Sequence, residues 1–485
     1  MKRVFALPLV VAVGALSSCV DTPEEPEDVG EAREALVTDC PYLNPALPEG
    51  APLANPVDYQ RELVITDLAV IDNPCRTTWT RGGLCAGTRG VWTFGMLMTR
   101  MAGTVPPAQF VADWLHSFEV PNVVNGFPVP ARPGIVGTII DPWLVASGCA
   151  AGTPVLACPT LDLKKAPFRL LGILNRSDLS GPGFGATEHG QTRFVFGATA
   201  NGDPLAGPSL PFTVIFEYDN PSLGVGRTDL QWVGDYHVLT DPAAVGALGS
   251  PAYLAKLQSI TDPITSPGAE PGKPNFGSTI ATFRTNEIAF GGPVWKMREY
   301  QLKSTGGGIN AFRLRLDPLD QTPDDSLNAT AALDGFLFPN STAGGSPALA
   351  DFTFTLPVGG FQGGESSAPL PGPSPWWDRL GTPLTPLERH HFGFATCNGC
   401  HRVETATPFV HLAPRNPGAP TVLSPFLSTS TVAGAGGLPA FVQNVADPAP
   451  TGATFHYNEP WRRVCEQTRI FKGFPDPWSR GHGGH

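Results

Sequence analysis

The sequence is poor in positive charge and lacks the patterns that identify several common enzyme classes. Its 32 lysine and arginine residues are outnumbered by 43 aspartate and glutamate residues, and the net charge of −11 argues against a nucleic-acid-binding protein. It contains no G-x-S-x-G, no H-E-x-x-H and no Walker loop. No repeat of about 20 to 50 residues recurs, which disfavours a propeller or a solenoid.

Long apolar runs are missing after the first residues of the chain. Lys2 and Arg3 precede the apolar run 4–16, which is too short to span a bilayer and is typical of a secretory signal. No later run approaches the ~18 apolar residues of a membrane-spanning helix. We therefore expect an exported protein whose mature chain is soluble apart from any attached lipid.

The end of this signal, Leu16-Ser17-Ser18-Cys19, resembles the lipobox of bacterial lipoproteins. The resemblance implies that residues 1–18 are removed and that Cys19 is lipidated. It further implies a protein of the cell envelope, attached to the membrane through its N-terminal lipid. Val20 after the anchor implies the outer membrane, on its periplasmic or surface side. An ordinary signal peptide with a chance cysteine is the alternative interpretation.

Composition divides the remaining chain into segments. Residues 19–39 are acidic, contain proline and have few apolar residues, so they predict a solvated tether. Residues 359–377 are rich in glycine, serine and proline, which is typical of a linker or an extended excursion. We therefore predict one domain over residues 40–358 and a second unit over residues 378–485. The 55 glycines and 53 prolines indicate a loop-rich protein with short strands.

The number of cysteines predicts disulfides. Setting aside Cys19 and a Cys-x-x-Cys pair leaves six of the nine cysteines, an even number in an exported chain. The short loops favour Cys75 with Cys85 and Cys149 with Cys158. Cys40 with Cys465 follows by elimination, although other connectivities are open.

Hydrophobic periodicity indicates an α+β fold with N-terminal helices and a mostly β large domain. Apolar residues recur at helical spacing over 91–101 and 107–118. After residue 162 the period changes to two, and strands are predicted at 168–175, 192–200, 212–219, 311–317 and 351–357. Polar side chains flank these strands, and we interpret them as structural ion pairs in preference to an active site. They are Asn175, Arg176, Asp178, Glu188, His189, Arg193, Arg284, Asn286 and Glu287.

The second unit contains the sequence Cys397-Asn398-Gly399-Cys400-His401. Before it, Thr385 and Glu388 form a predicted capping box with Pro386 at the first helical position, so a helix is expected to run toward Ala395. A helix that leads into Cys-x-x-Cys-His resembles the first helix of small c-type cytochromes. The resemblance implies one covalent haem c held by Cys397 and Cys400, with His401 as the proximal iron ligand, in a small helical unit.

The second axial ligand is not apparent from the sequence. No methionine follows His401, so a His/Met iron would need a ligand from the other domain. His411 is the leading candidate, His456 is the reserve, and an open sixth position is the third possibility. A zinc site with Cys397, Cys400, His401 and His411 or His456, and a Cys397–Cys400 disulfide, are the alternatives to haem.

These observations predict a lipid-anchored extracytoplasmic haem protein that transfers electrons to or from an unknown redox partner protein. A peroxidase-like enzyme is the second possibility, with His411, Glu404 or Arg402 as a polar group near the iron. The third is a haem-free surface-binding or scaffold lipoprotein. The sequence does not assign a task to residues 40–375.

Overall fold

The fold is described by a computed structural model. It covers residues 57–79, 85, 89–180, 189–221, 228–270, 272–288, 294–320, 322–351, 354–357, 359–369, 384–428, 443–449 and 452–472. Cys19, Cys40 and the predicted tether lie outside these residues. Within them, no helix is long and apolar enough to cross a membrane.

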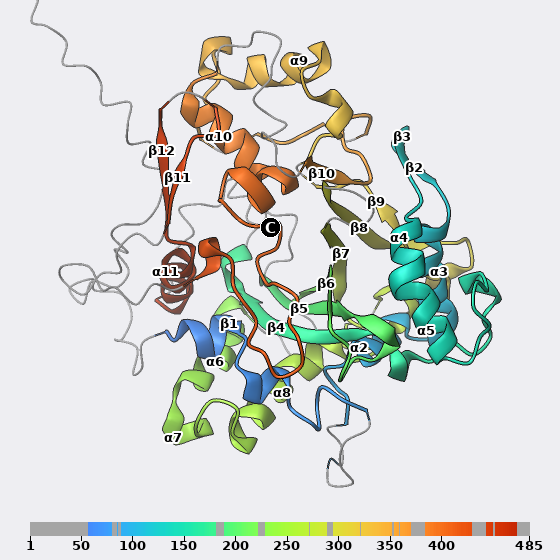
Figure 1. The fold of residues 1–485 in the computed structure, drawn as a ribbon. Helices are drawn as coiled ribbons and strands as arrows, with labels where there is room; N and C mark the ends of the chain where they lie inside the picture. Colours follow the sequence, from blue (N-terminus) through green and yellow to red (C-terminus); the bar gives the residue numbers. More distant parts are fainter. Residues whose placement is uncertain are drawn as a thin grey trace, which may run out of the picture.

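An antiparallel sheet of eight strands forms the centre of the fold (Figure 1). The strand order is β1-β4-β5-β6-β7-β8-β10, and β9 also pairs with β8. The strands are β1 (Val64–Ile65), β4 (Phe168–Arg176), β5 (Gln191–Thr199), β6 (Ser209–Asp219), β7 (Ile280–Ile288), β8 (Val294–Ser304), β9 (Phe312–Asp317) and β10 (Ser366–Pro369). The sheet confirms the predicted mixture of helices with a mostly β large region.

One face of the sheet is apolar and is covered by helices. Phe196, Phe216 and Phe283 lie on this face, and Phe216 packs edge-on against both of the others. They belong to a large buried cluster that includes Phe94 and Trp114 from the covering helices. Burying these large rings is the main source of stability in this part of the fold.

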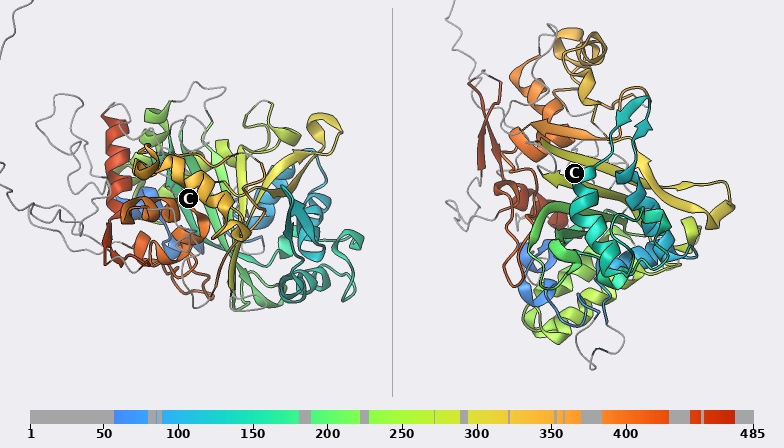
Figure 2. Two further views of the ribbon diagram at one scale, coloured as in Figure 1. Left: turned by 90° about the horizontal axis from the view of Figure 1, so that it is seen from above. Right: turned by 45° about the vertical axis from the view of Figure 1, so that its right-hand side comes forward.

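Several helices surround the sheet, as Figures 1 and 2 show from different sides. The predicted N-terminal helices are confirmed as α2 and α3. The helices are α1 (Leu68–Ile71), α2 (Phe94–Ala102), α3 (Pro107–Glu119), α4 (Pro133–Ile135), α5 (Asp141–Ala146), α6 (Asp229–His237), α7 (Pro242–Val245), α8 (Pro251–Thr265), α9 (Ala331–Asn340), α10 (Pro386–Ala395) and α11 (Glu459–Phe471). Two hairpins lie apart from the sheet: β2 (Asn122–Val124) with β3 (Phe127–Val129), and β11 (Gln443–Ala446) with β12 (Thr454–Tyr457).

The C-terminal part of the chain packs against the opposite face of the sheet. Leu174 of β4 and Val195 of β5 share a buried cluster with Leu412, Phe426 and Tyr457. This region contains α10, α11 and the β11–β12 hairpin, so strands and helices both contribute to it. A site in residues 378–485 can therefore include side chains from the sheet.

Two predictions about local structure are corrected. Residues 354–357 form no strand, although Phe354 and Leu356 are buried and their neighbours are exposed. The alternation arises because this extended segment packs on α9 and on Phe392 of α10 without a partner strand. Part of the glycine- and proline-rich segment, Ser366–Pro369, is β10 and pairs with the start of β8.

The two local disulfides are confirmed. Cys75 is bonded to Cys85 and Cys149 to Cys158. Cys465 in α11 is also disulfide-bonded, and Cys40, its expected partner, lies outside the described residues. The bonded cysteines agree with an oxidising compartment.

Candidate functional site

The predicted helix before the Cys-x-x-Cys-His sequence is present as α10. The Thr385 hydroxyl accepts a hydrogen bond from the backbone N of Glu388, whose carboxylate accepts one from the backbone N of Thr385 at 2.9 Å. Pro386 occupies the first helical position, and the helix ends at Ala395. All three features agree with the prediction made from the sequence.

A buried ionic network fastens α10 to the turn that carries His401. Glu404 accepts two hydrogen bonds from Arg389, at 2.7 and 2.9 Å, and one from Nδ1 of His390 at 2.7 Å. Asp447 contacts the same guanidinium at 2.7 Å. Burial alone would raise the pKa of Glu404, but Arg389 and His390 outweigh this effect and lower it. The helix and the turn are thus held together by paired charges.

Both cysteines of the motif are buried and free of any disulfide. Burial raises the pKa of the Cys397 thiol and of the Cys400 thiol to about 12, so both are protonated at neutral pH. Between them, Gly399 lies against Gly393, where an added Cβ would be 1.8 Å from the carbonyl oxygen. Only glycine therefore fits at this position of the turn.

The His401 side chain is held in one orientation by two contacts. Its Nδ1 donates a hydrogen bond to the carbonyl oxygen of Phe409 at 2.9 Å. Its ring stacks on Trp295 of β8, with centroids 5.1 Å apart and an interplanar angle of 18°. Burial lowers the pKa of His401 to about 4, so the imidazole is neutral at pH 7. Because Nδ1 carries the proton, Nε2 has its lone pair available as a metal ligand.

His411 lies beside His401 and the second cysteine. Its Nε2 is 3.7 Å from Cys400 Sγ, and its Nδ1 is 3.0 Å from the Ser424 hydroxyl. The ring centroids of His401 and His411 are 4.8 Å apart. Two imidazoles on opposite sides of one iron need centroids roughly 6 Å apart, given metal–nitrogen bonds of about 2 Å. In this arrangement the two rings are too close for trans ligation.

A pocket lies beside this histidine pair, between the sheet and the segment that follows the motif. It contains about 600 Å³ of empty space, including the part open to solvent. Side chains of the sheet line one side of the pocket, and the segment after the motif lines the other side. The lining from the sheet is Leu174, Arg176, Arg193, Val195, Thr213, Ile215, Glu217, Arg284, Asn286 and Met297, and the rest is His401, Val410, His411, Leu412, Phe426, Leu427 and Arg463.

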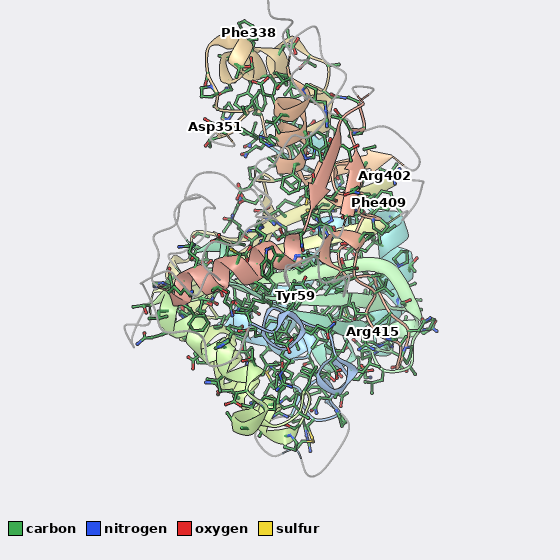
Figure 3. All side chains as sticks on the ribbon, turned by 90° about the vertical axis from the view of Figure 1, so that its left-hand side faces the viewer. Tyr59, Phe338, Asp351, Arg402, Phe409 and Arg415 are labelled. Carbon is green, nitrogen blue, oxygen red and sulfur yellow. A yellow bond between two sulfur atoms is a disulfide. The ribbon has the colours of Figure 1, made fainter. Side chains whose placement is uncertain are left out.

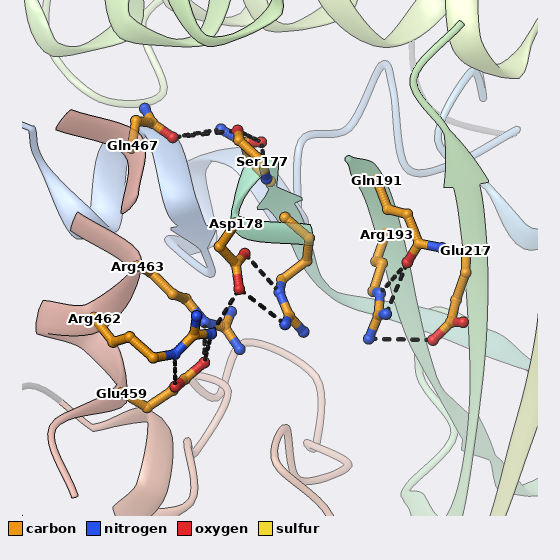
Figure 4. A network of polar contacts seen from close by, with 11 residues as sticks. Ser177, Asp178, Gln191, Arg193, Glu217, Glu459, Arg462, Arg463 and Gln467 are labelled. Atoms are coloured by element: carbon orange, nitrogen blue, oxygen red, sulfur yellow. Dashed lines mark hydrogen bonds and ion pairs between the residues drawn. The ribbon is translucent and has the colours of Figure 1, made fainter. Parts of the chain in front are cut away.

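Ion pairs hold the charged groups around this pocket (Figure 4). Asp178 contacts Arg176 at 2.9 Å and Arg462 at 2.6 Å. Glu217 of β6 lies 3.2 Å from Arg193 of β5. The structural interpretation of the strand-end charges is therefore correct for these pairs, but it missed that Arg176 and Arg193 line the same pocket as His401. The alternation of side chains along the predicted strands could have indicated the Arg193–Glu217 pair, because the two residues lie on the same face of adjacent strands.

The other candidate residues lie in different surroundings. Arg402 is over the Phe409 ring, with Cζ 4.7 Å from the centroid, and the two are labelled side by side in Figure 3. Glu404 is fully engaged in the network described above. His456 is in β12, paired with Asn444, and its side chain lies outside the described set. Met297, from the sheet, lines the same pocket as His401.

Among the described residues, no group of three or more His, Cys, Asp or Glu side chains is arranged to hold a metal ion. No protein-family model, curated protein or solved structure matches the chain. The site has to be interpreted from its own geometry.

Proposed function

We propose that this protein is a lipid-anchored c-type haem protein of the bacterial cell envelope that transfers electrons. Cys397 and Cys400 would hold one haem c through thioether bonds, and His401 would be the proximal ligand. A bound haem would supply one-electron transfer at its iron. Cys19 would anchor the chain in the outer membrane, and the redox partner would be another protein.

The state of His401 is the observation that carries the proposal. A ligating histidine usually donates its second ring nitrogen to a carbonyl or carboxylate, which fixes the tautomer and the ring orientation. His401 makes this hydrogen bond to Phe409, and its pKa of about 4 keeps it neutral. Stacking on Trp295 restrains the ring further. Burial by itself lowers the pKa, so the support comes from the hydrogen bond that fixes the tautomer and from the stacking that fixes the ring plane.

The state of the two thiols supports haem over the alternative sites. Cys397 and Cys400 form no disulfide, whereas Cys75–Cys85 and Cys149–Cys158 are bonded, so a disulfide at the motif is not favoured. Zinc requires three or four protein ligands in one place. A haem brings four nitrogen ligands of its own and needs only one histidine from this turn.

A second protein ligand would require a rearrangement of the site. His411 would have to move away from His401 to become a trans ligand, because their centroids are 4.8 Å apart. If His411 did not move, the iron would have one position open or would bind another side chain of the pocket. The small helical unit implied by the cytochrome resemblance is likewise part of this proposal.

The decisive experiment is expression of the full chain in a host that attaches c-type haem. The purified protein should gain the mass of one haem, stain for haem on a denaturing gel and keep its absorbance after unfolding. Replacing Cys397 and Cys400 together by Ala should abolish all three signals. A folded wild-type protein without covalent haem would overturn the proposal.

A matched control removes a different cysteine pair. Cys75→Ala with Cys85→Ala also deletes two sulfur atoms, but these lie outside the site. This variant should retain covalent haem even if it is less stable. Zinc analysis of the same samples tests the second alternative, because a zinc site would give one metal equivalent in wild-type protein and none in the Cys397/Cys400 variant.

A further inference from the structure

The pocket next to His401 has an unusual charge distribution. Its lining carries four guanidinium groups, of Arg176, Arg193, Arg284 and Arg463, and one carboxylate, of Glu217. Arg176 and Arg463 are 1% and 3% exposed, so both groups are buried. Placing several like charges in a buried space is costly unless anions compensate them.

Carboxylates behind the lining give only part of this compensation. Arg462 adds a fifth guanidinium to the network, between Asp178 and Glu459. The supporting carboxylates contact three of the lining arginines: Asp178 contacts Arg176 at 2.9 Å, Glu299 contacts Arg284 at 3.0 Å, and Glu459 contacts Arg463 at 2.8 Å. With Glu217, four carboxylates of the described residues thus contact five guanidinium groups.

Two buried acids near Arg284 make the compensation weaker. Burial raises the pKa of Glu299 to about 7, so this carboxyl group is partly protonated at neutral pH. The pKa of Asp320, which also interacts with Arg284, is raised by burial as well. With Asp320 counted, five acids face five guanidinium groups, and Glu299 is only partly ionised at neutral pH. The pocket therefore retains a partial excess of positive charge.

Unused hydrogen-bonding groups point to the same conclusion. Nη1 of Arg463 is buried and has no hydrogen-bond partner within the described residues. Arg193 contacts Glu217 and Gln191, yet burial lowers its pKa to about 9 because these contacts do not replace the lost water. A buried guanidinium nitrogen without an acceptor is destabilising by itself. An oxygen-bearing anion would satisfy it.

We propose that this pocket is a binding site for a small carboxylate or a similarly shaped planar oxoanion, held by the lining arginines beside His401. Guanidinium groups present paired N–H donors that match the two oxygens of such an anion. The carboxylate could come from a haem propionate or from a free small molecule. The inference rests on the arginines and their contacts and does not depend on the proposed haem.

The test uses the full chain with Cys397 and Cys400 both replaced by Ala, so that no haem can attach. Sodium formate and sodium acetate are titrated by calorimetry, with sodium chloride at equal ionic strength as reference. We expect saturable binding of formate or acetate and a higher thermal midpoint than in chloride, because a ligand that binds the folded state stabilises it. No saturable binding would overturn the proposal.

Two substitutions locate the binding in the pocket. Arg193→Gln removes one guanidinium, and Asn286→Asp places a carboxylate two residues from Arg284 on the same strand face with almost no change in shape. Each should weaken binding at least about tenfold. Arg193→Gln removes a charge-assisted pair with the anion, and Asn286→Asp supplies a carboxylate that takes the place of the anion beside Arg284. If Arg193→Gln does not fold, Asn286→Asp still decides the question.

A buried arginine outside the pocket is the matched control. Arg169 is in β4, the strand of Arg176, and is 6% exposed. It donates hydrogen bonds to the backbone oxygens of Arg415 and Gly207. Arg169→Gln should bind the anion within about twofold of the parent protein. Equal weakening in all three variants would mean a general loss of structure and would refute a localised site.

The haem-loaded protein then identifies the source of the carboxylate. If it binds formate as the haem-free protein does, the ligand is a free small anion. If haem attachment abolishes the binding, a propionate group occupies the pocket. A protein that fails to attach haem but binds formate would refute the proposed haem function and leave the anion site standing.

Discussion

Removing the Glu404 carboxylate should strongly destabilise the protein. Glu404 is fully buried and accepts three charge-assisted hydrogen bonds, two from Arg389 and one from His390. Of the two carboxylates that contact Arg389, Glu404→Ala leaves only Asp447. The same change removes the carboxylate that contacts His390. Breaking a buried ion pair from one side costs about 3–5 kcal/mol. We expect a loss of this size in the free energy of unfolding, measured by equilibrium denaturation.

A conservative variant and a surface variant give the comparison. Glu404→Gln keeps the shape and loses the charge, so it should cost about 1.5–3 kcal/mol. Glu270→Ala removes a more exposed ion pair with Lys273, which has an N–O distance of 3.2 Å, and should cost about 1 kcal/mol or less. A Glu404→Ala loss no larger than that of Glu270→Ala would refute the view that this network fastens α10 to the His401 turn.

The effect should also depend on pH in a defined direction. The folded-state pKa of Glu404 is lower than its usual value of 4.5, so its ionised form is favoured by folding. Its contribution to stability is therefore complete above the unfolded-state pKa and is lost as the pH falls through the folded-state pKa. The stability difference between wild type and Glu404→Ala should therefore shrink as the pH falls below 4.5. A difference that grows on acidification would contradict this account.

Three further predictions concern the anchor, the disulfides and the histidine pair. Cys19→Ala should move the protein from the membrane fraction to the soluble fraction, and a fully processed variant that stays membrane-bound would exclude lipidation. Replacing Cys149 and Cys158 together by Ala should lower the free energy of unfolding by about 2–3 kcal/mol, as expected for a short closed loop, and an unchanged denaturation midpoint would mean that this bridge adds no stability. His411→Ala should leave the spin state of the haem-loaded protein unchanged, because His411 lies too close to His401 for trans ligation; a change from a low-spin to a high-spin absorbance spectrum would instead show that His411 moves to bind the iron.

Local patterns predicted local structure well in this chain. The capping box at Thr385 and Glu388 placed α10 correctly, and the period-two pattern of 212–219 identified part of β6. These signals depend on residues a few positions apart, where backbone geometry determines which side chains share a face. The extended segment 354–357 misled the same reasoning, because burial on a helix produces the same alternation as pairing in a sheet.

The composition of the site was not predictable in the same way. The sequence identified Cys397, Cys400 and His401, but it contained no indication that Trp295 of β8 would stack on His401. Nor did it indicate that Arg463 of α11 would meet Arg193 at one pocket. These encounters depend on how the C-terminal segment lies over the sheet, which residue spacing alone does not determine.

The span of the pocket along the chain sets an order of events during biogenesis. Its lining begins at Leu174 and ends at Arg463, so the enclosure is incomplete until α11 has been synthesised and exported. The Cys-x-x-Cys-His sequence, in contrast, is contiguous and complete before that helix emerges. If haem is attached at Cys397 and Cys400 as proposed, attachment could take place before α11 packs over the pocket. A chain that stops before α11 would present the attachment sequence on an unfinished surface.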